Sequence, residues 1–271
     1  MQNWKLTLAY DGGAYHGWQV QPGLATIQGA LQAAIHRVLG ESPLPQGSGR
    51  TDTGVHALGQ VASFALAAPV PAENLQRALN RTLPAAIRVL KAEKALDDFH
   101  ARHSAIAKTY EYRIFRGTMC SPFLAQYVHA CRWSLDVDAL QKAAQDVVGE
   151  HDFVSLAASD PEVSGRAFAE AQEDAPGEFA TLARSTIRTI FSSEWAERPD
   201  DSLIYRVRGN GFLHHMVRNL VGTMLEIARG QFPAGSMPAI LEARSRSAAG
   251  PTAPARGLFL HSVEYPDGLL L

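Results

Sequence analysis

Residues 47–57 read GSGRTDTGVHA, and within these eleven positions the chain places three glycines, an arginine, an aspartate and a histidine. The stretch follows a segment with the periodicity of a helix and precedes one with the alternation of a strand. Glycine allows backbone with positive φ and lets another molecule approach closely, so the polar side chains between the glycines can be held at a surface. The pattern is typical of a loop that carries a functional site.

Composition alone leaves three other interpretations of this loop open. The first, which composition favours, is a hairpin-like turn in which Asp52 bonds only its own backbone. The second is a phosphate-binding loop, which is weakly supported because the stretch has neither a GK[ST] ending nor a GxGxxG before a helix. The third is a nucleophilic triad of Ser48, Asp52 and His56, but triad members are brought together by the fold and almost never lie within nine residues of one another.

The chain has 271 residues and is 46% hydrophobic and 19% charged, which excludes intrinsic disorder over most of its length. Its formal net charge of −2 at first argues against a nucleic-acid partner. Residues 159–183, however, hold six acids and one base, so that removing this segment of net charge −5 leaves +3 on the rest of the chain. We expect residues 159–183 to form a solvated acidic loop without chemistry, and the remainder is mildly basic.

Cysteine usage and hydropathy indicate where the protein works. Cys120 and Cys131 are too few for a disulfide framework and wrongly spaced for a zinc site. The first residues lack the basic flank and long apolar stretch of a signal peptide, and no later run approaches the length of a membrane span. We therefore expect a soluble cytoplasmic protein with no membrane partner.

Strand and helix patterns alternate in both halves of the chain, which indicates an α/β class. The best-marked helix has Thr26 at its start, apolar residues at helical spacing from Ile27 to Val38, and Gly40 at its end. Further strands are predicted at 5–10, 60–66, 87–92, 105–115, 185–195, 203–208 and 258–265, and further helices at 71–83, 136–148, 211–229 and 236–244.

A change of composition suggests the division into domains. Over residues 117–122 the sequence turns to Gly, Ser, Cys and Pro after a predicted strand, which is typical of a linker. We place an N-terminal α/β domain with the 47–57 loop at residues 1–110, and a C-terminal α/β domain with the acidic insertion at residues 111–271.

Five blocks of the sequence together resemble the tRNA pseudouridine synthase A family. GRTDTGVHA is similar to that family's signature, GRTDxGVHA, and the other blocks follow in the family's order along most of the chain. The acidic insertion at 159–183 is the chief departure from the usual pattern. The other four blocks are YDGGAYHGWQVQP from Tyr10, FHARHSAIAKTYEYRI from Phe99, GFLHHMVRNLVGTM from Gly211 and APARGLFLHSVEY from Ala253.

The resemblance implies both a fold and a reaction. The implied fold is the α/β (α+β) pseudouridine synthase fold, in which two α/β domains join their antiparallel sheets into one central sheet with an RNA-binding cleft, and the working unit is a homodimer. The implied reaction converts uridine to pseudouridine at positions 38 to 40 in the anticodon arm of tRNA, without cofactor or metal. It breaks an N-glycosidic bond, turns the uracil and rejoins it through carbon.

The resemblance also assigns roles to four residues. Asp52 matches the nucleophile, and it could add to the uracil ring, capture the sugar or remove a sugar proton. Arg50 would contact phosphate or fill the space of an extruded nucleotide. Tyr110 would stack on the flipped base and relay a proton, and Arg218 would form a salt bridge with Asp52.

The residues argue against two other functions. The first is a non-catalytic RNA-binding protein on the same scaffold, and the joint presence of Asp52, Tyr110 and Arg218 argues against it. A hydrolase of the usual glycosidase kind needs two carboxylates across the scissile bond, and residues 47–57 offer one.

Positive charge is concentrated in the stretch around the predicted domain boundary. Residues 99–116 carry a net charge of +3, which predicts a strip that tracks phosphates, with Arg102 and Lys108 as candidate RNA contacts. The alternative is a strand with ordinary solvated charges.

Two pairs of histidines, His100 with His103 and His214 with His215, could suggest a metal site. Adjacent histidines on a helix point about 100° apart, however, and the sequence has no HExxH motif. We predict no metal.

Overall fold

The computed structural model describes residues 1–158 and 185–270. The predicted acidic loop at 159–183 lies outside the described residues. The chain divides into two compact units, one made of Met1–Arg132, Ala196–Arg208 and Pro254–Leu271, the other of Trp133–Trp195 and Gly209–Ala253. Each unit is built around its own buried apolar core.

The first unit is built on strands that follow the order β4-β1-β3-β10-β5-β9. Strand β1 pairs antiparallel with both β3 and β4, and β10 pairs antiparallel with β5 and parallel with β3. Two short strands, β2 and β6, lie beside β3 and β5. The strands are β1 (Gln2–Tyr10), β2 (Gln46–Gly47), β3 (His56–Leu66), β4 (Ile87–Ala95), β5 (Ala107–Phe115), β6 (His129–Ala130), β9 (Ser202–Gly209) and β10 (Leu258–Glu264).

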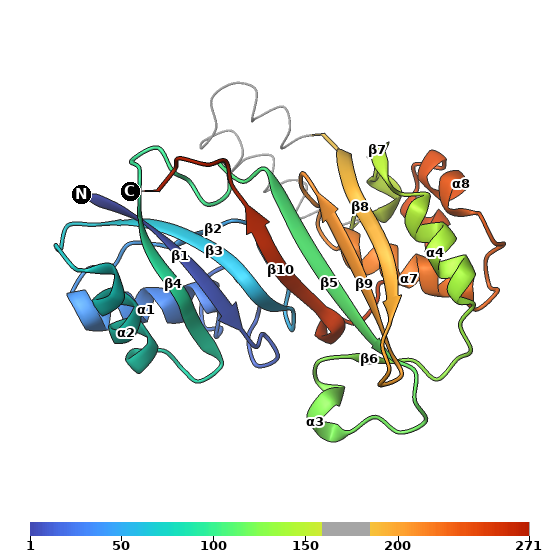
Figure 1. Ribbon diagram of the computed structural model, residues 1–271, viewed down its shortest axis with the longest axis horizontal. Helices are drawn as coiled ribbons and strands as arrows, with labels where there is room; N and C mark the ends of the chain where they lie inside the picture. Colours follow the sequence, from blue (N-terminus) through green and yellow to red (C-terminus); the bar gives the residue numbers. More distant parts are fainter. Residues whose placement is uncertain (159–184, 271) are drawn as a thin grey trace. The chain divides into compact units, whose positions relative to one another are not determined.

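Helices α1 (Ile27–Leu39) and α2 (Ala72–Thr82) belong to the first unit and lie beside β1 and β4 in Figure 1. Alternate residues of β1, from Trp4 to Leu8, are fully buried, as expected for a strand with one face on a core. The unit also contains a short helix, α3 (Pro122–Ala125), and a 3₁₀ turn, η3 (Ala255–Gly257).

The second unit packs α7 against α4, and its strand β7 pairs antiparallel with β8. Helix α7 has almost every residue buried, because apolar side chains cover most of its circumference. The elements are α4 (Val137–Gln145), β7 (Gly149–Asp152), η1 (Val154–Leu156), β8 (Ile187–Glu197), α7 (Met216–Ala228), α8 (Met237–Glu242) and η2 (Arg246–Ala248).

The ten strands within the described residues pair mostly antiparallel and helices accompany them in both units, so the predicted α/β class with antiparallel strands is confirmed. The caps of α1 are also as predicted: the Thr26 side chain accepts a hydrogen bond from the Gly29 amide, and Gly40 adopts a left-handed φ of 73°. None of the helices in the described ranges is long and apolar enough to cross a membrane.

Several element boundaries differ by a few residues from the sequence analysis, and one of these differences bears on the site. The helix predicted at 211–229 begins only at Met216, because His215 adopts a left-handed φ of 58° that a helix cannot contain. The predicted domain boundary at residue 110 falls inside β5, which the structure places in the first unit. The division into domains 1–110 and 111–271 stays a prediction.

Candidate active site

The loop at residues 47–57 follows β2, leads into β3, and is held by the segment that follows β1. The Trp18 amide donates to the carbonyl of Thr51 at 3.0 Å. Backbone packs on backbone so closely here that a Cβ on Gly17 would lie 2.5 Å from the Thr51 carbonyl oxygen, and one on Gly12 would lie 1.9 Å from that of Val55. Glycines in the YDGGAYHGW block are therefore required for this approach.

A buried polar network lies beneath the loop. The amide group of Gln60 donates to the carbonyl of Gly49 at 2.9 Å and accepts from the hydroxyl of Ser48 at 2.7 Å. Tyr10 and Thr51 share a hydrogen bond of 2.9 Å between their hydroxyl groups. Burial raises the pKa of Tyr10 to about 12, so its hydroxyl stays neutral and can keep these contacts. The network fixes the backbone on both sides of Arg50.

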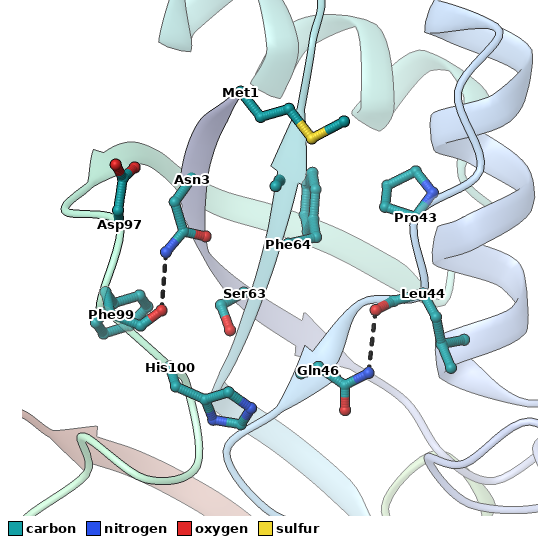
Figure 2. Close-up of a pocket in the computed structure, with 11 residues that line it drawn as sticks. Met1, Asn3, Pro43, Leu44, Gln46, Ser63, Phe64, Asp97, Phe99 and His100 are labelled. Atoms are coloured by element: carbon teal, nitrogen blue, oxygen red, sulfur yellow. Dashed lines mark hydrogen bonds between the residues drawn. The ribbon is translucent and has the colours of Figure 1, made fainter. Parts of the chain in front are cut away.

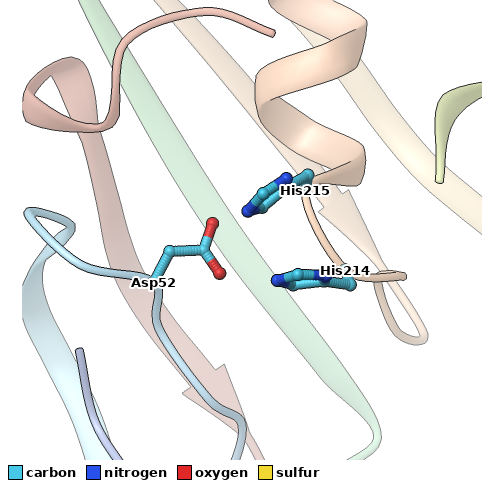
Figure 3. A group of neighbouring side chains, drawn as sticks. All are labelled: Asp52, His214 and His215. Atoms are coloured by element: carbon cyan, nitrogen blue, oxygen red, sulfur yellow. The ribbon is translucent and has the colours of Figure 1, made fainter. Parts of the chain in front are cut away.

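Asp52 is half-buried on this loop, and Figure 3 shows its carboxylate extending away from the loop backbone. Its carbonyl accepts a hydrogen bond from the Val55 amide at 3.1 Å, so the backbone does form the tight turn that composition suggested. Burial raises the pKa of the Tyr110 hydroxyl, and the neighbouring Tyr10 and the charge of Asp52 raise it further. Asp52 and Tyr110 are thus close enough to interact electrostatically.

Strand β5 presents Lys108, Tyr110 and Tyr112 in alternation. Tyr112 is fully buried and its hydroxyl donates to the carbonyl of Pro254 at 2.8 Å, so it is a core residue. Tyr110 is 8% exposed. The Lys108 ammonium donates to the carbonyl of Ser48 in the loop. One strand therefore places a phenol and an ammonium beside the loop of Asp52.

Arg50 and Arg102 are both exposed. Partial desolvation by surrounding atoms lowers the pKa of Arg102, and the positive charge of Arg50 lowers it further, which puts the two guanidinium groups near one another. Arg102 follows His100 in a turn, where the His100 Nδ1 accepts from the amides of Arg102 and His103 at 3.1 and 3.3 Å. His100 therefore uses this nitrogen to shape the turn.

The predicted positive strip at 99–116 is less uniform than its net charge suggests. Glu111 is 3% exposed and accepts from Arg113 at 2.8 Å and from Arg206 at 2.9 Å. Arg116 pairs with Glu197 at 2.7 Å. The two arginines near the end of the strip are thus paired with carboxylates.

His56 has a structural environment that sequence analysis did not predict. It is 1% exposed, stacks on Phe259 with ring centroids 4.8 Å apart, and has Nδ1 3.0 Å from the Asp11 Oδ1 atom. The Tyr127 hydroxyl donates to the other carboxylate oxygen of Asp11 at 2.9 Å. His56 thus faces Asp11, while the Ser48 hydroxyl donates to Gln60, so these two residues are engaged elsewhere than in a triad with Asp52. The signal in the sequence was the presence of Asp11 and His56 in two of the five blocks.

In the second unit, the start of α7 carries the other predicted residues. The rings of His214 and His215 lie 3.9 Å apart and are tilted by 34° (Figure 3). The two residues precede the helix, so the expected 100° separation on a helix does not apply to them. The Arg218 Nε donates to the carbonyl of Ala253 at 2.8 Å, which orients this half-buried side chain.

A pocket of about 490 Å³ in the first unit does not include the predicted site residues (Figure 2). Asn3 and Gln46 line it, and their amide groups donate to the carbonyls of Phe99 and Leu44. Asp97 is the acidic residue among those that line this pocket. The side chains with an arrangement suited to chemistry lie at the 47–57 loop instead.

Comparisons with a family profile and with individual known proteins point to the same family. The family profile described as tRNA pseudouridine synthase matches residues 7–104 and 143–266. A Solibacter usitatus protein named tRNA pseudouridine synthase A is 51% identical over 266 residues, which cover 98% of this chain and 100% of that protein. Proteins of the same name from Moorella thermoacetica and Bacillus pumilus are 43% and 40% identical, covering 96% and 97% of this chain and 98% and 99% of theirs.

The buried histidines predict how stability depends on pH. Burial lowers the pKa of His56, against the opposing charge of Asp11, and burial and the charge of Arg256 lower the pKa of His129. The unfolded chain, with a reference histidine pKa of about 6.5, therefore binds protons before the folded one does. We expect the melting temperature to fall as the pH is lowered from 7.5 to 5.5.

Thermal unfolding monitored by circular dichroism checks this prediction. Replacement of His129 by Asn should reduce the fall, whereas the same change at the exposed His16 should leave it unchanged. Carboxylates with lowered pKa values, such as Glu264, lose their stabilising effect only below about pH 4.5, outside the range tested. A melting temperature that stays constant over the range would contradict the prediction.

Proposed function

Because the chain belongs to the tRNA pseudouridine synthase A family, we propose that it converts uridine to pseudouridine at positions 38 to 40 in the anticodon arm of tRNA. Such an enzyme is an isomerase: the C1′–N1 bond breaks, a C1′–C5 bond forms, and the proton lost from C5 is balanced by one gained at N1. The observation that carries the proposal is the 47–57 loop, where a half-buried carboxylate lies near a buried phenol on a fixed backbone.

We assign the nucleophile to Asp52. A carboxylate can add to carbon and later leave, as a reaction that detaches and reattaches one base requires. The turn at Val55 and the hydrogen bonds to Ser48 and Gly49 hold the loop on both sides of it. Attack on the ring, capture of the sugar and removal of a sugar proton are all compatible with this placement.

Tyr110, Arg50 and Arg218 complete the proposed site. Burial keeps the Tyr110 hydroxyl protonated, which suits a group that stacks on the base and donates or relays a proton. The exposed Arg50 suits a phosphate contact or the space left by an extruded nucleotide. Arg218, whose assignment rests on the resemblance, would pair with the Asp52 carboxylate and keep it ionised.

Mapping of pseudouridine tests substrate, position and nucleophile together. Total tRNA is incubated with the purified protein, and pseudouridine is located by chemical labelling and primer extension. The wild type should give stops at positions 38 to 40. Asp52→Asn should remove turnover while tRNA affinity stays within roughly tenfold, or about 1.4 kcal/mol, because affinity is spread over many phosphate contacts.

Asp138→Asn is the matched control, since it removes the same charge from an exposed position on α4. Folding of both variants is checked by circular dichroism. In Asp52→Asn the proposed partner, Arg218, would lose its counter-charge, which could lower the stability of the protein. Turnover near the wild-type rate in folded Asp52→Asn would refute the nucleophile. Binding of tRNA by the wild type without any pseudouridine would favour a non-catalytic RNA-binding protein.

We further propose that tRNA is bound through phosphate contacts near the loop, with Arg102 and Lys108 among them. Release of counterions makes such binding fall steeply with added salt. Arg102→Gln should weaken binding and reduce the slope of log affinity against log salt by about one. Arg77→Gln, on the exposed face of α2, should leave the slope unchanged. An affinity that does not depend on salt, measured by filter binding, would contradict this proposal.

The proposed working unit is a homodimer, as the resemblance implies, and the proposed location is the cytoplasm. Closed twofold dimers are the commonest assembly of soluble oligomers. Light scattering at the concentrations used for activity should give twice the mass of the chain, which is 29.3 kDa. A monomer that is active under those conditions would overturn the dimer.

A further inference from the structure

Two consecutive carbonyl groups of the loop, those of Ser48 and Gly49, are each bound by a side chain from a different strand. Lys108 on β5 donates its ammonium to the carbonyl of Ser48. Gln60 on β3 donates its amide to the carbonyl of Gly49 at 2.9 Å. These carbonyls immediately precede Arg50 and lie three to four positions before Asp52. The backbone of the loop is thus held from two strands just before its functional residues.

The ammonium of Lys108 lies directly against the loop backbone. A Cβ on Gly49 would be 3.2 Å from the Lys108 Nζ atom, which is tighter than nine in ten real Cβ contacts. The lack of a side chain at Gly49 therefore leaves room for the ammonium at the position it occupies. Lys108 is half-buried, and a hydrogen bond from a charged donor is stronger than one between neutral groups.

Gln60 anchors the neighbouring carbonyl from within the core. It is fully buried and its carbonyl oxygen accepts from the Ser48 hydroxyl at 2.7 Å. Ser48 is consequently bound at its side chain by Gln60 and at its carbonyl by Lys108. The two contacts restrict the same residue in different directions.

We propose that Lys108 is a positioning residue for Asp52, which acts by binding the Ser48 carbonyl and not only by contacting RNA. Lys108 also lies two positions before Tyr110 on the same face of β5, so one strand sets the position of both the loop and the phenol. The inference rests on the proposed function. From its charge, Lys108 was expected only to contact phosphates, and the structure adds the role of holding the loop. Loss of the contact impairs the chemical step even when the enzyme is saturated with tRNA.

Single-turnover measurements at saturating tRNA separate this role from RNA binding. Lys108→Met keeps an unbranched side chain that is one atom shorter and removes the donor, and the rate should fall about tenfold or more. Lys108→Gln has a side chain of the same length as methionine and keeps a neutral donor, so it should retain more of the rate than Lys108→Met. Lys94→Met, which removes the same charge from an exposed position on β4, should leave the rate unchanged.

Hydrogen exchange of the free protein provides a readout that does not depend on activity. Amides of residues 48–52 should exchange faster in Lys108→Met than in the wild type or in Lys94→Met, because the loop samples more conformations. If Lys108→Met does not fold, Lys108→Ala is measured in its place, since water can fill the half-exposed position.

Three results would be decisive against the proposal or its premise. An unchanged rate at saturating tRNA, with only a weaker affinity, would overturn it and make Lys108 a phosphate contact alone. An equal loss of single-turnover rate in Lys108→Met and Lys108→Gln, with unchanged hydrogen exchange of the loop, would also overturn it. The missing charge, and not the contact with the Ser48 carbonyl, would then explain the slower rate. If the wild type forms no pseudouridine but the loop exchanges faster in Lys108→Met, the proposed function fails while the contact with the loop stands.

Discussion

The close approach of two stretches of backbone, residues 11–18 and 47–57, is the constraint on which the candidate site depends. A side chain at Gly12 would place its Cβ 1.9 Å from the carbonyl oxygen of Val55, and that atom belongs to backbone and cannot swing aside. The glycine is therefore needed for packing, whatever its flexibility contributes. Because this approach fixes the path of the loop, the position of Asp52 follows from residues that are distant in the sequence.

Regular periodicity made most of the fold predictable. Helix α1 was found with both caps, because a threonine, an apolar repeat and a glycine occur at the required spacing. Strands β2 and β6 are only two residues long and carry no period that could reveal them. The start of α7 was misplaced because His215 adopts a left-handed φ without being glycine, and nothing in the local composition distinguishes it from a helical residue.

The candidate site was predictable only where its residues are adjacent in sequence. The glycine-rich loop with Asp52 stood out from its composition, and the roles of Tyr110 and Arg218 came from the family resemblance. The proximity of His56 to Asp11 could not be derived, because it arises when β3 and the end of β1 are brought together by the sheet. For the same reason, a count of charges could not show that Glu111 pairs with Arg206 from a distant strand.

Glycine lets another molecule approach this loop closely, but it also allows the loop backbone more conformations. The buried polar network restricts these conformations. A buried hydroxyl or amide left without a partner costs about 1–3 kcal/mol. Conformations of the loop that break the bonds of Gln60 with Ser48 and Gly49, or that of Tyr10 with Thr51, are disfavoured by amounts of this order each. A catalytic site needs its groups held to within a fraction of an ångström, so a loop that is restricted before the substrate arrives suits the function proposed for it. The network therefore connects the sequence of the loop to its geometry: the glycines of the loop and of residues 11–18 allow the two backbones to approach, and the serine, threonine and carbonyl groups of the loop determine where Asp52 is held.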